Sequence, residues 1–500
     1  MVEARNRHLP AQSGRGGRAA GHAGGVGLTD VRIEPGSFRD PDSRVLYTAD
    51  GVVRALSARG LDDYRKVAAT GFFPRLMEEG KIVRTEEAQL DGLRETGLPR
   101  GEAAGLLRHE RIPFVSYPYE WPFSMLREAA LLQLELVAAA LEEGMILKDS
   151  SPYNVQWRGS RAVFVDVGSF EPLREGEPWI GYRQFCMLFL YPLMLLANEG
   201  IDYQPLLRGS LDGVSPTQAA AMLSGVRGGV LKHVKLHAKL ERRYDDSSQR
   251  DVKKDLKSAG FNPELIKANV KGLRKLIGGM SWEPGGSEWS DYGDTCTYSD
   301  EESREKAEFV REAAAARRHT LAWDIGANDG RYSRIAAEHA DYTVAIDIDH
   351  LTVDRLHRAL RAEGRDDVLT LVMNLADPSP GLGWRGRERK PLEGRGRPDL
   401  VLCLALVHHL AITANVPLSE VVDWLASLGA TVVVEFPTRE DPMVQRLLAG
   451  KREETHADYE LPVFERILGE AFEIERRAEL QGGRRVIFQA HPRGGNGAAP

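Results

Sequence analysis

The residues best suited to chemistry in this 500-residue chain lie within positions 321–349. A short apolar run ends at Asp324, and Gly326 and Gly330 then bracket a turn. Glycines at such a turn let a ligand approach the backbone without meeting a Cβ atom. The next segment is predicted to be a helix, whose N-terminal N–H groups favour a carboxylate or a phosphate. Asp347 ends the following apolar segment, where its carboxylate can accept both hydroxyls of a ribose, so the pattern predicts a nucleotide-edge pocket.

The spacing of this turn differs from the dinucleotide fingerprint G-x-G-x-x-G, because Asn328 and Arg331 occupy the second and third glycine positions. Asn328 tolerates the left-handed backbone that a glycine would supply. D-x-G-x-N-x-G with an acidic strand end resembles motif I and the acidic loop of class I S-adenosylmethionine-dependent methyltransferases, which more often carry a third glycine. The alternative is an ordinary turn in which the glycines only punctuate a helix. The resemblance implies S-adenosylmethionine as cofactor and a site formed by Asp324, Gly326, Asn328, Gly330 and Asp347.

Asn374 follows the third strand of this half, which is predicted over Val368–Met373. Its amide offers a donor and an acceptor, which suits the edge of an adenine. The family more often has an aspartate at this position, and the carboxylate in this chain comes later, at Asp377. Two interpretations of Asn374 therefore stay open, a contact with adenine and a simple loop cap.

Two adjacent histidines, His408 and His409, follow a strand predicted over Asp399–Ala405, where a methyl acceptor would lie beside the sulfonium. An acceptor hydroxyl or amine loses a proton as it attacks, and an imidazole with a pKa near ~6.5 suits that role at neutral pH. Either histidine is a candidate base. The alternative is that one packs beneath the next helix while the other shapes the pocket. Glu435, at the end of a strand predicted from Thr431, would orient the substrate or cap a helix.

The N-terminal half carries a second constellation, in which the spacing resembles a protein-kinase catalytic core. Asn154 follows Asp149 at the interval of H-R-D-x-x-x-x-N, and Asp166 begins Asp-Val-Gly where D-F-G would follow a short hairpin. In such a site one aspartate lies beside the acceptor hydroxyl, while an asparagine and a second aspartate hold Mg²⁺ against nucleotide phosphates. The resemblance implies Asp149 as a catalytic residue. It implies Asn154 and Asp166 as metal ligands, and Mg-ATP as a second cofactor, if this site binds a nucleotide.

This half departs from the kinase family at the lysine that contacts the phosphates. No V-A-I-K motif is present, and the strand predicted over Val52–Leu56 offers Arg54 instead. Position alone makes Glu78 or Glu79 the expected partner of Arg54. Arginine and lysine are not interchangeable at a tight phosphate site. We therefore expect a substrate-binding scaffold, whose polar residues tie loops together, in preference to active phosphotransfer.

The surrounding segments predict the α/β class. After Asp349, helix and strand patterns alternate, which predicts a doubly wound parallel sheet. Two final strands, near Phe472–Ala478 and Arg485–Gln489, resemble the antiparallel pair that completes a methyltransferase sheet. The expected architecture is a Rossmann-like methyltransferase fold with a seven-stranded, mostly parallel sheet, preceded by an α+β kinase-like domain. The resemblance is to a bacterial group of class I methyltransferases with a long N-terminal extension.

The expected domain organisation has five parts. They are a flexible tail over 1–27, the kinase-like domain over 28–281, a linker or lid over 282–299, the methyltransferase domain over 300–492 and a second tail over 493–500. In the linker, Tyr292 and Tyr298 would fold over the cofactor. The basic segments 232–243 and 253–275 are predicted to be helices with a solvated face, with an anionic ligand site as the alternative.

Composition limits the compartment and the partners. With 28% charged and 42% hydrophobic residues, the chain is typical of soluble globular proteins, and a net charge of -7 gives no basic field for nucleic acid. The cysteines, at 186, 296 and 403, form no CxxC motif, which indicates a reducing, cytoplasmic setting. The longest apolar run, Phe185–Ala197, is shorter than the ~20 residues of a membrane span and contains Pro192. A buried core helix is expected there.

These observations predict a cytoplasmic S-adenosylmethionine-dependent methyltransferase that acts on an oxygen or nitrogen of a small-molecule or glycan-type substrate. Its N-terminal domain would bind or modify that substrate. One alternative is a bifunctional kinase and methyltransferase that phosphorylates a hydroxyl and methylates the product. Another is a non-catalytic pseudokinase joined to a domain that senses S-adenosylmethionine.

Overall fold

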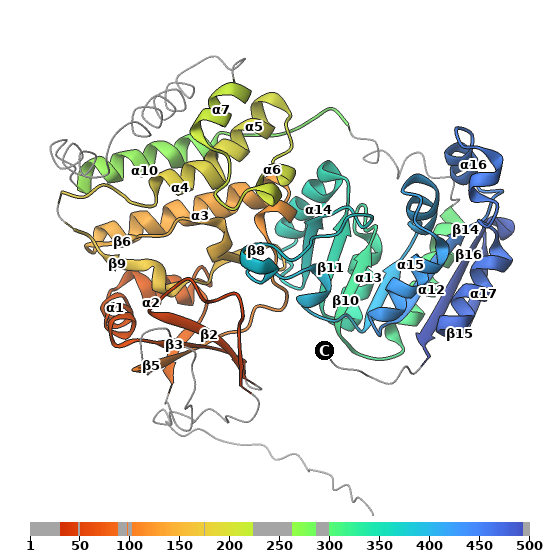
Figure 1. Ribbon diagram of the computed structural model, residues 1–500, viewed down its shortest axis with the longest axis horizontal. Coiled ribbons are helices and arrows are strands. Elements are labelled where there is room, and N and C mark those ends of the chain that lie inside the picture. The colour runs from red at the N-terminus through yellow and green to blue at the C-terminus, as the bar shows by residue number, and fades with distance from the viewer. Residues whose placement is uncertain are drawn as a thin grey trace, which may run out of the picture.

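The computed structural model of the protein describes residues 31–48, 51–88, 98, 103–174, 176–223, 263–286 and 300–493. Figure 1 shows an N-terminal and a C-terminal half side by side. The predicted tails, most of the basic segments, and Tyr292 and Tyr298 of the predicted linker lie outside the described residues.

The C-terminal half is built on one seven-stranded sheet in the order β12-β11-β10-β13-β14-β16-β15. Strands β10 to β14 are parallel, and β16 is antiparallel to both of its neighbours. The predicted mostly parallel sheet with an antiparallel final pair is therefore confirmed. Its strands are β10 (His319–Ile325), β11 (Ala340–Asp347), β12 (Val368–Val372), β13 (Leu400–Cys403), β14 (Thr431–Pro437), β15 (Phe472–Leu480) and β16 (Arg485–Pro492).

The strand order of this sheet reverses at β10. From β10 the chain continues outward through β11 and β12, and then crosses to β13 on the other side. Ligands of open α/β sheets bind outside the carboxyl ends of the strands at such a switch point. The turn after β10 and the histidine pair after β13 both begin there.

Helices cover both faces of this sheet (Figure 1). Strands β10, β13 and β14 are buried on both faces almost throughout, so their sequences are mainly apolar and contain only a few polar residues, such as Asp324 and Glu435. The helices are α12 (Asp300–Ala315), α13 (Arg331–His339), α14 (His350–Ala362), α15 (Leu418–Ser427), α16 (Pro442–Leu448) and α17 (Leu461–Ala471).

The N-terminal half begins with an antiparallel sheet in the order β1-β2-β3-β5-β4, with α1 and α2 between β3 and β4. A long helix, α3, then leads to short strand pairs and further helices. The kinase-like assignment itself stays a prediction. The first elements are β1 (Arg32–Ile33), β2 (Ser43–Thr48), β3 (Gly51–Leu56), α1 (Ala58–Ala68), α2 (Phe72–Glu78), β4 (Thr85–Ala88), β5 (Gly105–His109) and α3 (Phe123–Glu142).

After α3 come two antiparallel pairs, β6 with β9 and β7 with β8, which supply the predicted short hairpin. The remaining elements are β6 (Met145–Leu147), β7 (Val155–Arg158), β8 (Arg161–Phe164), β9 (Phe170–Pro172), α4 (Tyr182–Phe185), α5 (Tyr191–Glu199), α6 (Gln204–Gly209), α7 (Pro216–Met222) and α10 (Pro263–Gly278).

The apolar run around Pro192 is a largely buried helix, as predicted. A π-helical turn, Cys186–Leu190, joins α4 to α5, and Pro192 stands in the first turn of α5, where its missing N–H is tolerated. Among the residues that the structure describes, no helix is both long and apolar enough to cross a membrane.

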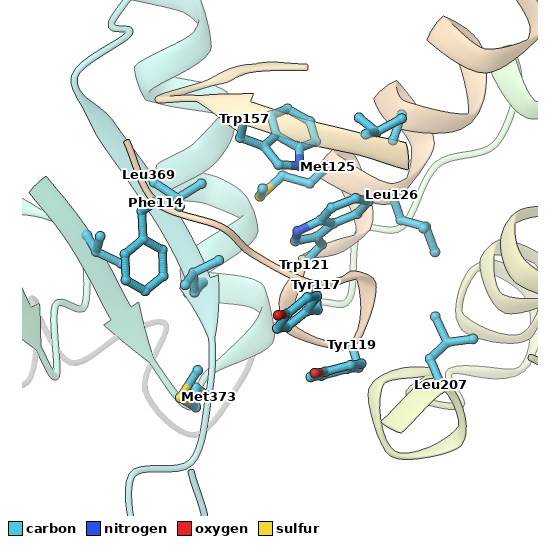
Figure 2. Close-up of a cluster of buried hydrophobic side chains, with 14 of the residues drawn as sticks. Phe114, Tyr117, Tyr119, Trp121, Met125, Leu126, Trp157, Leu207, Leu369 and Met373 are labelled. Atoms are coloured by element: carbon cyan, nitrogen blue, oxygen red, sulfur yellow. The ribbon is translucent and has the colours of Figure 1, made fainter. Parts of the chain in front are cut away.

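The two halves share one hydrophobic core. Figure 2 shows aromatic side chains of the segment between β5 and α3, including Phe114 and Trp121, beside Leu369 and Met373 of the C-terminal half. The rings of Phe114 and Trp323 meet edge to face, with their centroids 6.2 Å apart. An ion pair also crosses this interface, because Arg395 donates to both carboxylate oxygens of Glu120 at 2.7 and 2.8 Å, with both side chains buried.

Candidate functional site

The turn after β10 has the left-handed backbone that its sequence predicted. Gly326, Asn328 and Gly330 have φ values of 84°, 47° and 74°. The N–H groups of Gly326 and Ala327 both donate to the carbonyl of Ile346, at 2.8 and 3.0 Å. These bonds fasten the turn to the end of β11. Gly330 is the residue immediately before α13, so the N-terminus of that helix opens at the turn.

Asp347 lies at the end of β11 and meets this turn directly. One of its carboxylate oxygens accepts the N–H of Asn328 at 2.9 Å, and the other accepts the N–H of Asp349 at 2.9 Å. Burial raises the pKa of Asp347, and the two backbone donors counteract that rise. The donors fix the direction of the carboxylate. Each oxygen can accept a second hydrogen bond, which suits a ligand diol.

Asp324 is buried and points toward α13. Its carboxylate accepts a hydrogen bond from the Ser333 hydroxyl at 2.5 Å. Burial raises the pKa of Asp324 to about 7. The bond with Ser333 joins α13 to β10. We therefore expect Asp324 to influence ligand binding by positioning the N-terminus of α13, without touching the ligand itself.

Asn374 is exposed after β12, and its side-chain oxygen accepts the N–H of Ala376 at 2.9 Å. This is the loop-cap arrangement, and the contact with adenine stays a prediction. The nearby Asp377 carboxylate binds Arg208 of the N-terminal half with two bonds of 3.0 Å.

The histidine pair begins just beyond β13, and the two rings differ in exposure. His408 is fully buried, and within the described part of the chain neither of its ring nitrogens has a hydrogen-bond partner. His409 is half-buried, with its ring centroid 4.0 Å from that of His408. Burial lowers the pKa of His408 well below its usual value, and burial with Arg485 lowers that of His409 to about 4. Both rings are therefore neutral at neutral pH.

A buried ionic network supports this edge of the sheet. The Glu435 carboxylate accepts hydrogen bonds from Lys306 Nζ at 2.7 Å and from the backbone N–H of Ala405 at 2.8 Å. Arg485 lies 3.5 Å from the other oxygen of Glu435 and donates to Asp441 at 2.7 Å. All four charged side chains are almost completely buried, and buried charges persist only when they are paired.

Of these four residues only Glu435 was predicted from the sequence, and Lys306, Asp441 and Arg485 were not. A signal for Lys306 was present, because it stands at helical spacing from the buried Val310 and Ala313 and so belongs to the apolar face of α12. Glu435 caps the Ala405 N–H, not a helix end.

Ala405 stores backbone strain beside the turn. Its φ is 50°, a conformation that a residue with a Cβ rarely adopts, and Glu435 holds its N–H there. The adjacent Leu404 carbonyl would lie 3.5 Å from a Cβ atom on Gly326. The strained end of β13 and the turn after β10 thus form one compact edge.

The three kinase-like residues come together in the N-terminal half. Arg54 of β3 reaches Asp166 at 2.6 Å, and the Ser169 hydroxyl donates to the other oxygen of Asp166. Asn154 donates to Ser169 at 3.3 Å, and Asp149 accepts the N–H of Ser151 at 3.0 Å. Burial opposes the charge of Asp166, but Arg54 and Ser169 hold its pKa below the usual value. Burial and the charge of Asp166 raise the pKa of Asp149.

The expected partner of Arg54 was wrong. Glu79 receives hydrogen bonds from Arg75 at 2.9 Å and Lys81 at 2.7 Å, and Arg54 binds Asp166 instead. With one carboxylate oxygen on a guanidinium and the other on a hydroxyl, Asp166 is arranged as a structural anchor. The roles predicted for Asn154 and Asp166 as metal ligands, and for Asp149 as a catalytic residue, stay predictions.

The strand order and the turn define a Rossmann-like α/β protein, in which the described turn, Asp347 and the histidine pair lie at or just beyond the carboxyl ends of β10, β11 and β13. No family model matches the chain. The nodulation protein NoeA of Rhizobium meliloti (strain 1021) is 32% identical over 459 residues, which cover 91% of this chain and 94% of that protein. The chain belongs to the family of this nodulation protein.

Part of the chain was matched to solved structures of methyltransferases. The N-methyltransferase NodS from Bradyrhizobium japonicum WM9 covers 39% of this chain and 98% of its own, with 14% identity and a TM-score of 0.28. The magnesium protoporphyrin IX methyltransferase ChlM from Synechocystis PCC 6803, with bound SAH, covers 38% of this chain and 84% of its own, with 18% identity and a TM-score of 0.28. Scores this low carry no argument, so the description of the fold rests on its strand order.

Proposed function

We propose that the protein is an S-adenosylmethionine-dependent methyltransferase with its cofactor at the carboxyl ends of β10 and β11. The observation that carries this proposal is the bond from the Asn328 N–H to the Asp347 carboxylate, which joins a left-handed turn to an oriented acidic group. The carboxylate suits the ribose hydroxyls. The N-terminus of α13, which opens at Gly330, suits the carboxylate of the methionine part.

The proposed methyl acceptor is an oxygen or nitrogen of a small-molecule or glycan-type substrate. Bound S-adenosylmethionine would supply an electrophilic methyl group. The chain would supply orientation and a dry site, which account for much of the rate of such a displacement. We assign the contact with the acceptor to His409, because it is half-buried, whereas His408 is fully buried beneath it. A neutral His409 can accept a hydrogen bond from an acceptor O–H or N–H.

The N-terminal half is proposed to bind the substrate, and the protein is proposed to act in the cytoplasm. We include a role in nodulation in this proposal, because the relative that covers most of the chain is named a nodulation protein. The engaged carboxylate of Asp166 favours a scaffold over phosphotransfer in this half.

Methyl-labelled S-adenosylmethionine tests this function when the full chain is incubated with fractionated small-molecule, glycan and protein extracts. We expect label in a small-molecule or glycan fraction. The His409→Ala variant should transfer label about 100-fold more slowly, at the low end of the 10²–10⁴-fold typical of general-base groups, because a pKa of about 4 makes His409 a weaker base than a free imidazole. His491→Ala is the matched control, because His491 is partly exposed on the distant strand β16 and pairs with Glu475. Absence of label in every fraction with the wild-type protein would contradict the enzymatic function.

A further inference from the structure

A ligand-sized space lies at the junction of the two halves. It is a cavity of about 910 Å³, within the range of small-molecule sites. One wall comes from β1 to β3 and the segment after β5, another from Asn154 and Asp166, and a third from residues 388–396 of the C-terminal half. The Gly326 turn and the histidine pair are not part of its lining. The space is therefore separate from the proposed methyl-donor site.

Three arginines of this lining have a buried Nε–H group without an acceptor among the described residues. Their other contacts hold them in place: Arg54 binds Asp166 at 2.6 Å, Arg395 binds Glu120 at 2.7 and 2.8 Å, and Arg389 lies 4.0 Å above the ring of Tyr153. A buried donor without an acceptor is costly and uncommon in folded proteins. Arg54 and Arg389 keep 13% and 14% of their side chains exposed, so they are the two that an anion in the cavity can reach, whereas Arg395 is fully enclosed and supports the wall.

The lining also carries a neutral imidazole, His109. The Thr85 hydroxyl lies 3.0 Å from the Val83 carbonyl oxygen and 2.9 Å from Nδ1 of His109. We assign the hydroxyl proton to the carbonyl, which can only accept, so that Nδ1 donates to the hydroxyl and Nε2 is the acceptor. Burial and Arg54 lower the pKa of His109 to about 3, so the ring is neutral. Nε2 is buried without a partner in the part of the chain that the structure describes.

The charges of the lining suit a dianion. It has seven Arg or Lys and five Asp or Glu side chains, and 7 − 5 leaves an excess of two positive charges. A phosphate monoester carries about -1.5 to -2 charges at neutral pH. Guanidinium groups bind phosphate directly through fixed N–H donors, without a bridging metal. Asp166, the carboxylate nearest to Arg54, is already engaged by Arg54 and Ser169.

We propose that this cavity binds a phosphate ester of a small hydroxyl- or amine-bearing molecule without a divalent metal. The phosphate lies against the arginines, and an O–H or N–H of the same molecule donates to His109 Nε2. Because residues 388–396 belong to the C-terminal half, the bound ester contacts both halves at once.

Calorimetry on the full-length chain in EDTA tests the proposal, with AMP, glucose 1-phosphate and inorganic phosphate as probes. We expect at least one ester to bind more tightly than inorganic phosphate. Arg389→Gln should weaken that binding about tenfold or more, as expected for the loss of a charge-assisted hydrogen bond. Arg466→Gln is the control, because Arg466 is exposed on α17 and pairs with Glu470. Tighter binding of AMP would identify the ligand as a nucleotide, and tighter binding of glucose 1-phosphate would identify it as a sugar phosphate.

A second variant separates the donor contact from general stability. His109→Phe should reduce the preference for the ester over inorganic phosphate, because only the ester has a group that donates to Nε2. Thermal melting without ligand checks that each variant is folded, and the Arg389→Gln result decides the proposal if His109→Phe does not fold. The proposal is overturned if no ester binds at millimolar concentration, if binding requires Mg²⁺, or if Arg389→Gln binds as the wild type does.

Discussion

At the scale of single residues, the site depends on groups whose surroundings alter their usual chemistry. Asn328 adopts a backbone conformation more typical of glycine, Ala405 is held in a similar one, and both lie at the same edge of the sheet. Burial raises the pKa of the Asp324 carboxyl to about 7, so this group is partly protonated near neutral pH. Strain and shifted pKa values gather at functional sites more often than elsewhere.

The raised pKa of Asp324 predicts a pH dependence of stability. The pKa rises from 3.8 in the unfolded chain to about 7 in the folded protein, so folding favours the protonated carboxyl. Its contribution to stability is complete below pH 3.8 and is lost as the pH rises to about 7. In Asp324→Asn this part of the pH dependence should disappear. Urea unfolding of both proteins across this range measures the difference, and parallel pH profiles would contradict the assigned pKa.

Single residues also show what sequence can predict. Glycine spacing and one asparagine predicted the conformation of the turn, because left-handed positions select for few residue types. The burial of His408 and the orientation of Asp324 were not predictable, because they depend on helices packed over the sheet.

At the scale of elements, the ionic network fastens α12 to β14. Lys306 and Glu435 are separated by 129 positions and meet at 2.7 Å with both side chains buried. The sequence showed only that Lys306 stands on an apolar helix face, and it contained no local sign of the partner. The strands of the C-terminal sheet were predicted to within about three residues at most ends, because buried parallel strands are short apolar runs between amphipathic helices.

Removing the shared anion should destabilise the protein strongly. In Glu435→Ala, Lys306 and Arg485 lose a buried partner, and breaking a buried pair typically costs about 3–5 kcal/mol. The free energy of unfolding in urea measures the loss. Glu470→Ala is the matched control, because its exposed pair with Arg466 should contribute less than about 1 kcal/mol. Similar losses in both variants would show that the network is not a structural tie.

The ion pair between Arg54 of β3 and Asp166 after β8 predicts that the protein does not hydrolyse ATP. Since Arg54 and Ser169 occupy the Asp166 carboxylate, we expect no magnesium-dependent ATP turnover by the wild-type protein. Asp166→Ala should then behave as the wild type does in a phosphate-release assay. Turnover in the wild type that is lost in Asp166→Ala would instead establish a bifunctional kinase and methyltransferase.

At the scale of the whole molecule, the two halves are packed as one unit. The aromatic segment before α3 shares a hydrophobic core with β12 (Figure 2). Arg395 also pairs with Glu120 across the interface. The sequence predicted two domains from their motifs, but it did not predict this interface. Residues that are far apart in the sequence leave no local sequence pattern that would predict their contact. The predicted linker over 282–299 lies mostly outside the described residues.

Calorimetry with S-adenosylmethionine on the wild-type protein and on Gly326→Arg tests whether the cofactor binds at the turn after β10. We expect the wild type to bind and the variant to bind at least about tenfold more weakly, because an arginine at a φ of 84° strains the turn and places its side chain in the proposed cofactor site. Gly429→Arg, at an exposed glycine with a φ of 70° and no atom within 4 Å of the added Cβ, should retain wild-type affinity. Equal affinity of all three proteins, or no binding by the wild type, would contradict a cofactor site at this turn.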